Sequence, residues 1–303
     1  MSMRVATFAM NDRMLAASLK TQARMAEMQM QQATGQIATD LGGYGAVSRS
    51  LINLEISLAR SQTYATSSKE AGNRVEVMYS TMDTVNDVLS SFRSALVAIK
   101  STDAGDETRS ALSNTAKLNI EELATLLNTQ YEGRYLFGGS ATTIAPVDLS
   151  AYAMTDPDTA DTSYYQGNST LAAVQVSSEQ SISYGVSAND GAFEKAFRAF
   201  SIISSANGTL WDETVNAALD LIVEAIDGAA GVQGSLSVNA ATLERAQTRE
   251  EDYQAHLSAS LSDVRDADVT ELAVKLTAYE VQLQAAYATL AKIQGLNLLD
   301  YLR

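Results

Sequence analysis

The sequence predicts a mainly α-helical protein: a long, coiled-coil-like helical rod built from both ends of the chain, with a small β-rich insert at its centre. Apolar residues recur at alternating intervals of three and four positions in both outer parts, a spacing typical of packed helices. The only two prolines, Pro146 and Pro157, are central. Because proline costs about 3 kcal/mol inside a helix, the proline-free flanks favour long uninterrupted helices.

Composition limits the classes of function that the chain can have. It has 303 residues, 46% of them apolar, which suits a folded protein of one to three domains. The net charge of −15 repels phosphate groups and anionic lipids, so neither nucleic acid nor a membrane is an expected partner. The absence of cysteine excludes disulfides, thiolate catalysis and cysteine metal sites. Residues 1–12 lack the continuous apolar core of a signal peptide, so we do not expect general secretory export.

The first predicted helix covers residues 4–36 and has an apolar stripe that is rich in methionine. The stripe residues that we assign to an assembly interface are Phe8, Leu15, Leu19, Met25 and Met28. Methionine is unbranched and adaptable, so this stripe suits a contact that adjusts to its partner. Gly35 and the glycines at 42–45 then interrupt the helix.

A second helix is predicted over residues 46–100, with a regular heptad pattern in its latter half. The predicted rod core consists of Val75, Met78, Met82, Val85, Leu89, Phe92, Leu96 and Ile99. A heptad of this kind predicts a seam for a helical partner. A third helix follows from about residue 106, and it ends in the tyrosine- and glycine-rich segment 131–139.

Residues 140–189 form the predicted insert, where serine and threonine are frequent and both prolines occur. Alternating residues at 164–168, 174–176 and 181–186 predict short strands there. Helices then return, first a short phenylalanine-rich one. Another begins after Thr209 and is expected to end at Gly228 as a C-cap, before a long helix from about Gly234.

The last helix has the most regular pattern in the chain, and it completes the predicted assembly interface. Its stripe consists of Val269, Leu272, Leu276, Tyr279, Leu283, Ala286, Leu290 and Ile293, followed by the apolar Leu298 and Leu299. A single pair of terminal helices cannot bury both of their stripes, so the remaining apolar surface is expected to meet other subunits. Head-to-tail contacts of this kind make a ring or a helical fibre. A monomeric helical bundle with ordinary core stripes is the alternative.

No residue pattern indicates catalysis, a cofactor or a metal site. His256 is the only histidine, and a lone histidine in a chain without cysteine is far more often a surface or packing residue than a ligand. The acidic clusters at 250–252 and 263–268 fit solvated helix faces, and neither has the spacing of a calcium loop. The glycine-rich spots lack the Lys-Ser/Thr that would indicate phosphate binding. We therefore expect no enzyme activity and no cofactor.

Three segments resemble the flagellin superfamily, and within it the FlgL-type hook-associated proteins. Residues 28–35 (MQMQQATG) resemble the end of the family's first helix, and residues 283–302 resemble its C-terminal helix. Residues 127–139 (LNTQYEGRYLFGG) resemble the exit from the third helix of the junction proteins and are the most specific of the three. The segment after Gly35 departs from the family pattern, and the insert matches only in position.

The resemblance implies three domains and a role in the flagellum. Residues 1–40 and 266–303 would form a terminal helical assembly domain that is disordered in the monomer. Residues 41–139 and 190–265 would form the rod, and 140–189 a small β-rich outer domain. The implied function is a structural subunit that joins hook to filament, and a filament-forming flagellin or a soluble coiled-coil scaffold are the alternatives.

The resemblance also implies partners and a location. The partners would be further copies of the chain in a ring or helical layer, the preceding hook-associated junction protein, flagellin, and a cytoplasmic export chaperone that covers the C-terminal helix. The subunit would be extracellular in the bacterial flagellum, after export by the flagellar type III apparatus.

Overall fold

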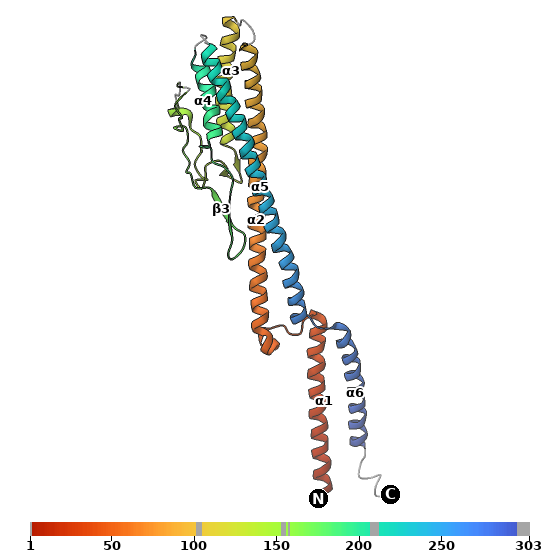
Figure 1. The fold of residues 1–303 in the computed structure, drawn as a ribbon. Helices are drawn as coiled ribbons and strands as arrows, with labels where there is room; N and C mark the ends of the chain where they lie inside the picture. The colour runs from red at the N-terminus through yellow and green to blue at the C-terminus, as the bar shows by residue number, and fades with distance from the viewer. Residues whose placement is uncertain (1, 101–104, 153–155, 157, 207–211, 296–303) are drawn as a thin grey trace. The chain divides into compact units, whose positions relative to one another are not determined.

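A computed structural model describes residues 2–100, 105–152, 156, 158–206 and 212–295. The chain divides into two compact units, Met1–Arg60 with Gln254–Arg303 (the terminal unit) and Ser61–Tyr253 (the central unit). The helices α2 (Ser48–Lys100) and α5 (Asp212–Arg265) each contribute residues to both units (Figure 1). The predicted mainly α fold with a small β insert is confirmed.

The central unit is held together by one large apolar core between helices. Parts of α2 and α5 lie side by side there with α3 (Asp106–Leu127) and α4 (Gly191–Ser205) (Figure 1). All eight predicted rod-core residues belong to this core or pack against it: Val75, Met78, Met82, Val85, Leu89, Phe92, Leu96 and Ile99. Polar bonds fix the register of the two long helices, because Ser61 Oγ donates to the Glu250 carbonyl at 3.0 Å and Asn86 Nδ2 donates to Gln233 Oε1 at 2.8 Å.

The prediction of a helix end at Gly228 was wrong, because α5 continues through it to Arg265. The glycine has a packing role instead. A Cβ atom at Gly228 would lie only 2.9 Å from the Cβ of Ala192 in α4, so the missing side chain allows the two helices to approach closely. The sequence alone does not distinguish this packing role from a C-cap, because glycine is favoured in both situations.

The insert contains less regular strand than its sequence suggests. Before the insert, two strands of two residues each, β1 (Gln130–Tyr131) and β2 (Arg134–Tyr135), form a hairpin. Glu132 and Gly133 both have positive φ angles, of 51° and 73°, as the tightest hairpin turn requires. Within the insert, β3 (Ala172–Gln175) pairs with β4 (Ser181–Tyr184), after the short 3₁₀ helix η2 (Leu149–Ala151). The predicted strand at 164–168 is reduced to one bridge between Val147 and Tyr165.

The insert is anchored to the helices by buried aromatic and apolar side chains. Val147, Tyr164, Val176 and Ile182 all belong to the same core as the helices. The Tyr164 ring packs on Phe197 with centroids 4.4 Å apart, and its hydroxyl donates to the Ala188 carbonyl at 3.0 Å. Burial raises the pKa of Tyr164, so the hydroxyl stays protonated and remains a donor. The insert thus packs within the central unit, and the division into three domains stays a prediction.

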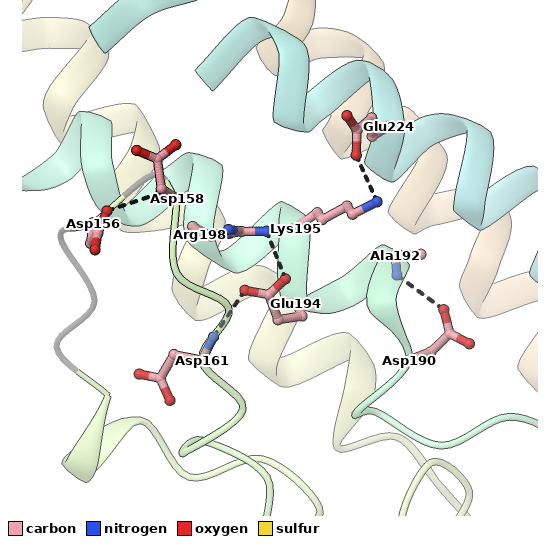
Figure 2. A network of polar contacts seen from close by, with 9 residues as sticks. All are labelled: Asp156, Asp158, Asp161, Asp190, Ala192, Glu194, Lys195, Arg198 and Glu224. Carbon is pink, nitrogen blue, oxygen red and sulfur yellow. Dashed lines mark hydrogen bonds and ion pairs between the residues drawn. The ribbon is translucent and has the colours of Figure 1, made fainter. Parts of the chain in front are cut away.

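A buried ion pair gives the insert its second anchor (Figure 2). Arg198 Nη2 and Glu194 Oε2 lie 3.1 Å apart, one turn apart on α4, and both residues are buried. The other carboxylate oxygen of Glu194 accepts a hydrogen bond from the Asp161 backbone N–H at 3.1 Å. Glu194 therefore neutralises a buried cation and holds an insert backbone group at the same time.

We predict that Phe92→Ala lowers the free energy of unfolding of the central unit by about 3–5 kcal/mol, because the ring is fully buried and packs edge-on against Phe200 at 4.8 Å. The measurement is urea denaturation followed by circular dichroism. Val97→Ala is the control on the same helix, because Val97 is 47% exposed where Phe92 is 1% exposed. The control is expected to stay within about 0.5 kcal/mol of the parent. Equal unfolding midpoints for the two variants would contradict the assigned core.

We also predict that Glu194→Ala destabilises the central unit by about 3–5 kcal/mol, because it removes the carboxylate that neutralises buried Arg198. Glu224→Ala is the matched control, since Glu224 forms an exposed pair with Lys195 at 2.7 Å on the neighbouring surface (Figure 2). We expect little change from the control, because exposed pairs contribute little. Thermal melting of both variants decides the point, and a larger loss from the control would refute the buried anchor.

Candidate assembly interface

The terminal unit contains an antiparallel helix pair, α1 (Ser2–Thr34) and α6 (Val269–Gly295), which lie side by side (Figure 1). The least exposed positions on each helix form a regular heptad seam. Between residues 10 and 30 of α1 they are Asn11, Met14, Ser18, Thr21, Met25 and Met28, and on α6 they are Leu272, Leu276, Tyr279, Leu283, Ala286 and Leu290. The alternation of three and four keeps both sets on one helix face, so the pair has the spacing of a two-helix coiled coil.

The seam between α1 and α6 is thinly packed. In residues 10–34 of α1, where side chains are described, Ser18 is the one buried residue. On α6, Leu272 and Leu276 are buried at its start, whereas the later seam residues are half-buried. No described residue of either helix belongs to the large apolar core or to the smaller cluster of the terminal unit. The pair therefore buries little apolar surface to offset the entropy of ordering two long helices.

Helix α6 has a second apolar stripe on its opposite side. Its members are Val274, Ala278, Val281, Ala285 and Ala288, and all five are exposed. Each follows a seam residue by two positions, which is a rotation of about 200° around an α-helix. Helix α1 likewise exposes Met10, Leu15, Leu19 and Met30. The second stripe of α6 was not identified from the sequence, because three of its five members are alanines, which are small and only weakly apolar. Its spacing is nevertheless visible in the sequence.

The structure distributes the predicted interface residues over two faces. Met25, Met28, Leu272, Leu276, Tyr279, Leu283 and Leu290 line the seam, whereas Leu15, Leu19 and Val269 are exposed. Phe8 lies in α1 and Ile293 in α6, with side chains outside the described part of the structure. Leu298 and Leu299 lie outside the described residues altogether. The predicted α1 stripe thus combines seam positions with outward positions.

Backbone hydrogen bonds tie together the two segments that lead into the helix pair. The Ile37 N–H donates to the Arg265 carbonyl at 2.8 Å, and the Ala267 N–H donates to the Gly35 carbonyl at 2.9 Å. These bonds flank an antiparallel bridge between Gln36 and Asp266. The segment that follows α1 and the segment that precedes α6 are therefore bonded to each other where the helix pair begins.

The glycine-rich segment after α1 forms a compact 3₁₀ helix, η1 (Leu41–Val47). Tyr44 is buried beside Leu51 and Leu261, and its hydroxyl donates to the Ala38 carbonyl at 2.9 Å. A Cβ atom at Gly43 would lie 2.4 Å from the Cβ of Ala38, so the turn requires glycine at this position. The segment that departs from the family pattern is thus an ordered joint within the terminal unit.

The acidic residues at 263–268 have local structural roles at the start of α6. Asp268 Oδ1 accepts hydrogen bonds from the backbone N–H groups of Thr270 at 2.9 Å and Glu271 at 3.0 Å, as a helix N-cap does. Hydrogen bonds from Ser262 and Arg265 lower the pKa of Asp266. The cluster, which fits a solvated helix face in the sequence, therefore helps to position α6.

Little else in the described structure suggests chemistry. No group of three or more histidine or carboxylate side chains among the described residues is placed to hold a metal ion. His256 is exposed on α5. None of the helices in the described part of the chain has both the length and the apolar character that a membrane span needs. The candidate functional site is therefore the set of apolar faces on α1 and α6.

Comparisons with known proteins agree with this architecture. Residues 219–302 match the family model of the bacterial flagellin C-terminal helical region, which includes most of α5 and the whole of α6. No curated protein is significantly similar in sequence.

Among solved structures, a protein of Vibrio parahaemolyticus described as a flagellar hook-associated protein is similar with a TM-score of 0.61 and 17% identity, over 75% of this chain and 99% of that one. FlgL of Bacillus cereus is similar with a TM-score of 0.54 and 16% identity, over 69% and 97% of the two chains. FlgL of Xanthomonas campestris is similar with a TM-score of 0.53 and 12% identity, over 69% of this chain and 98% of that one.

At these identities the solved structures establish the fold, and the family model identifies the C-terminal helices. Both agree with the resemblance that residues 28–35, 127–139 and 283–302 indicate. The chain therefore contains a bacterial flagellin C-terminal helical region over residues 219–302 and has the fold of the FlgL-type hook-associated proteins.

Proposed function

We propose that this chain is a structural subunit of the bacterial flagellum that joins the hook to the filament. The observation that carries the proposal is the second apolar stripe of α6, Val274, Ala278, Val281, Ala285 and Ala288, which α1 leaves exposed. A helix that is apolar on two opposite sides needs a neighbour on each side. Within one subunit α1 supplies one neighbour, so other subunits are proposed to supply the other.

The proposed assembly is a ring or a helical layer of copies of this chain. Exposed apolar residues on α1, among them Leu15 and Leu19, offer a surface of the same character as the free side of α6. Contact between two different faces is heterologous, and such contacts generate rings or helical tubes. The three-way division of roles, with the ends assembling, the helices as a rod and the insert outermost, is part of this proposal.

The names of similar proteins support a flagellar structural role, and the hook–filament junction is the finer part of the proposal. One similar structure is described as a flagellar hook-associated protein and another as FlgL, and these names favour a junction subunit. Its proposed partners are the preceding hook-associated junction protein and flagellin. Before export by the flagellar type III apparatus, a cytoplasmic chaperone would cover the free stripe of α6, which otherwise invites non-specific association.

A filament-forming flagellin is the second candidate, and the match of residues 219–302 to a flagellin C-terminal region favours it. Seeded polymerisation viewed by negative-stain electron microscopy separates the two. A thin cap on hook ends that already carry the preceding junction protein is expected for the junction subunit. Long filaments growing from flagellar fragments would instead establish a flagellin, and no binding to either seed would overturn the flagellar role.

In the same assay we predict that Leu283→Asp or Leu290→Asp reduces binding to the seed at least about tenfold, because a charge in the seam costs several kcal/mol when it is desolvated. Both leucines are half-buried on the seam face of α6. Gln284→Asp is the control, since it adds the same charge at an exposed position one residue from Leu283. The melting temperature of the central unit is expected to stay the same in all three variants. Full binding by both seam variants would contradict the interface.

We further propose that the terminal helices become stably ordered only on assembly, because their seam is thin and outside the apolar clusters. Hydrogen exchange of the free subunit is expected to show amides of α1 and α6 exchanging at least about a hundredfold faster than those of the α2 core around Phe92. In the assembled form the difference is expected to shrink. Equal protection of both regions in the free subunit would contradict this proposal.

A further inference from the structure

The methionines whose side chains the structure describes are divided between two very different environments. Five of the ten lie between residues 10 and 30 of α1: Met10, Met14, Met25, Met28 and Met30. Met10 and Met30 are 59% and 57% exposed, and the other three are half-buried in the seam with α6. In the central unit, Met78 and Met82 are 2% and 0% exposed.

This division matters because thioethers are the principal oxidisable sulfur groups of a chain without cysteine. Oxidation of a methionine follows its access to the oxidant, so α1 and the central core are expected to differ strongly. The seam methionines are half-buried and lie outside both apolar clusters, so we expect their contact with α6 to open more readily than the packed core.

We infer that Met14, Met25 and Met28 are oxidation sites whose conversion to methionine sulfoxide prevents the α1–α6 pair from taking part in assembly; this rests on the proposed function. The oxidant is a hydroperoxide. One of its oxygen atoms is transferred to the thioether sulfur, which is oxidised by two electrons, while the O–O bond breaks and the peroxide is reduced to water or an alcohol.

The consequence follows from the place of these three side chains. The described seam already contains the polar residues Asn11, Ser18 and Thr21, so Met14, Met25 and Met28 are the apolar seam residues of α1 between positions 10 and 30. A sulfoxide is polar and accepts hydrogen bonds, and burying it in the seam without a hydrogen-bond donor is unfavourable. Methionine sulfoxide reductases would reverse the change.

The first test measures where oxidation occurs. The purified full chain is treated with hydrogen peroxide, and sulfoxide at each methionine is followed in time by peptide mass spectrometry. All five methionines at 10–30 are expected to oxidise at least about tenfold faster than Met78 and Met82. Equal rates in the two groups would overturn the inference.

The second test measures the effect with matched variants. Seeded assembly is compared before and after peroxide for the parent, for Met14→Leu/Met25→Leu/Met28→Leu, and for Met10→Leu/Met30→Leu, each against its own untreated sample. The parent and the Met10/Met30 variant are expected to lose assembly at least about tenfold, whereas the seam variant loses less than about twofold, because it retains no oxidisable sulfur in the described seam.

The outcomes separate this inference from the function on which it rests. If the untreated parent binds no seed, the proposed function is overturned, and so is the inference that oxidation prevents assembly. A parent that assembles normally after complete oxidation of Met14, Met25 and Met28 overturns the inference alone. A seam variant that loses as much assembly as the parent also overturns it, because the damage then lies at other methionines.

Discussion

The pairing of α2 with α5 in the central unit is the interaction on which the other elements depend. Their facing apolar residues form one core, into which α3 and α4 also pack. Gly228 permits the close approach of α4 to α5, and Tyr164 brings the insert onto α4. Each added element buries surface that the long helices expose, so none of them would have a place to dock without that pair.

The terminal unit follows a different physical rule. Its helix pair has heptad spacing but little burial, and polar side chains take several of its seam positions. Its best-packed part lies where the helix pair begins. There, Tyr44, Leu51 and Leu261 form a small apolar cluster, and a backbone hydrogen bond joins Ala267 to Gly35. A pair built in this way keeps apolar surface available for neighbours, and it remains sensitive to any change of polarity in the seam.

The contrast between the two units fits the proposed function, in which one chain has a stable core and a pair of helices that assembles with other subunits. The central unit hides its apolar residues and fixes its buried charge with the Glu194–Arg198 pair. The terminal helices leave apolar stripes uncovered, which is costly for an isolated subunit and useful for one that packs into a tube. In the proposed function, stability and assembly therefore depend on different parts of the sequence.

The sequence by itself determined the long helices α1, α2 and α6, the rod-core heptad from Val75 to Ile99 and the seam of α6, because these depend on local periodicity that a chain displays directly. It also determined the family resemblance. Only the tertiary structure decided the role of Gly228, the position of the insert in the helical core and the split of the α1 stripe between two faces. Those features depend on which surfaces meet across long sequence separations, and spacing along a single helix does not contain that information.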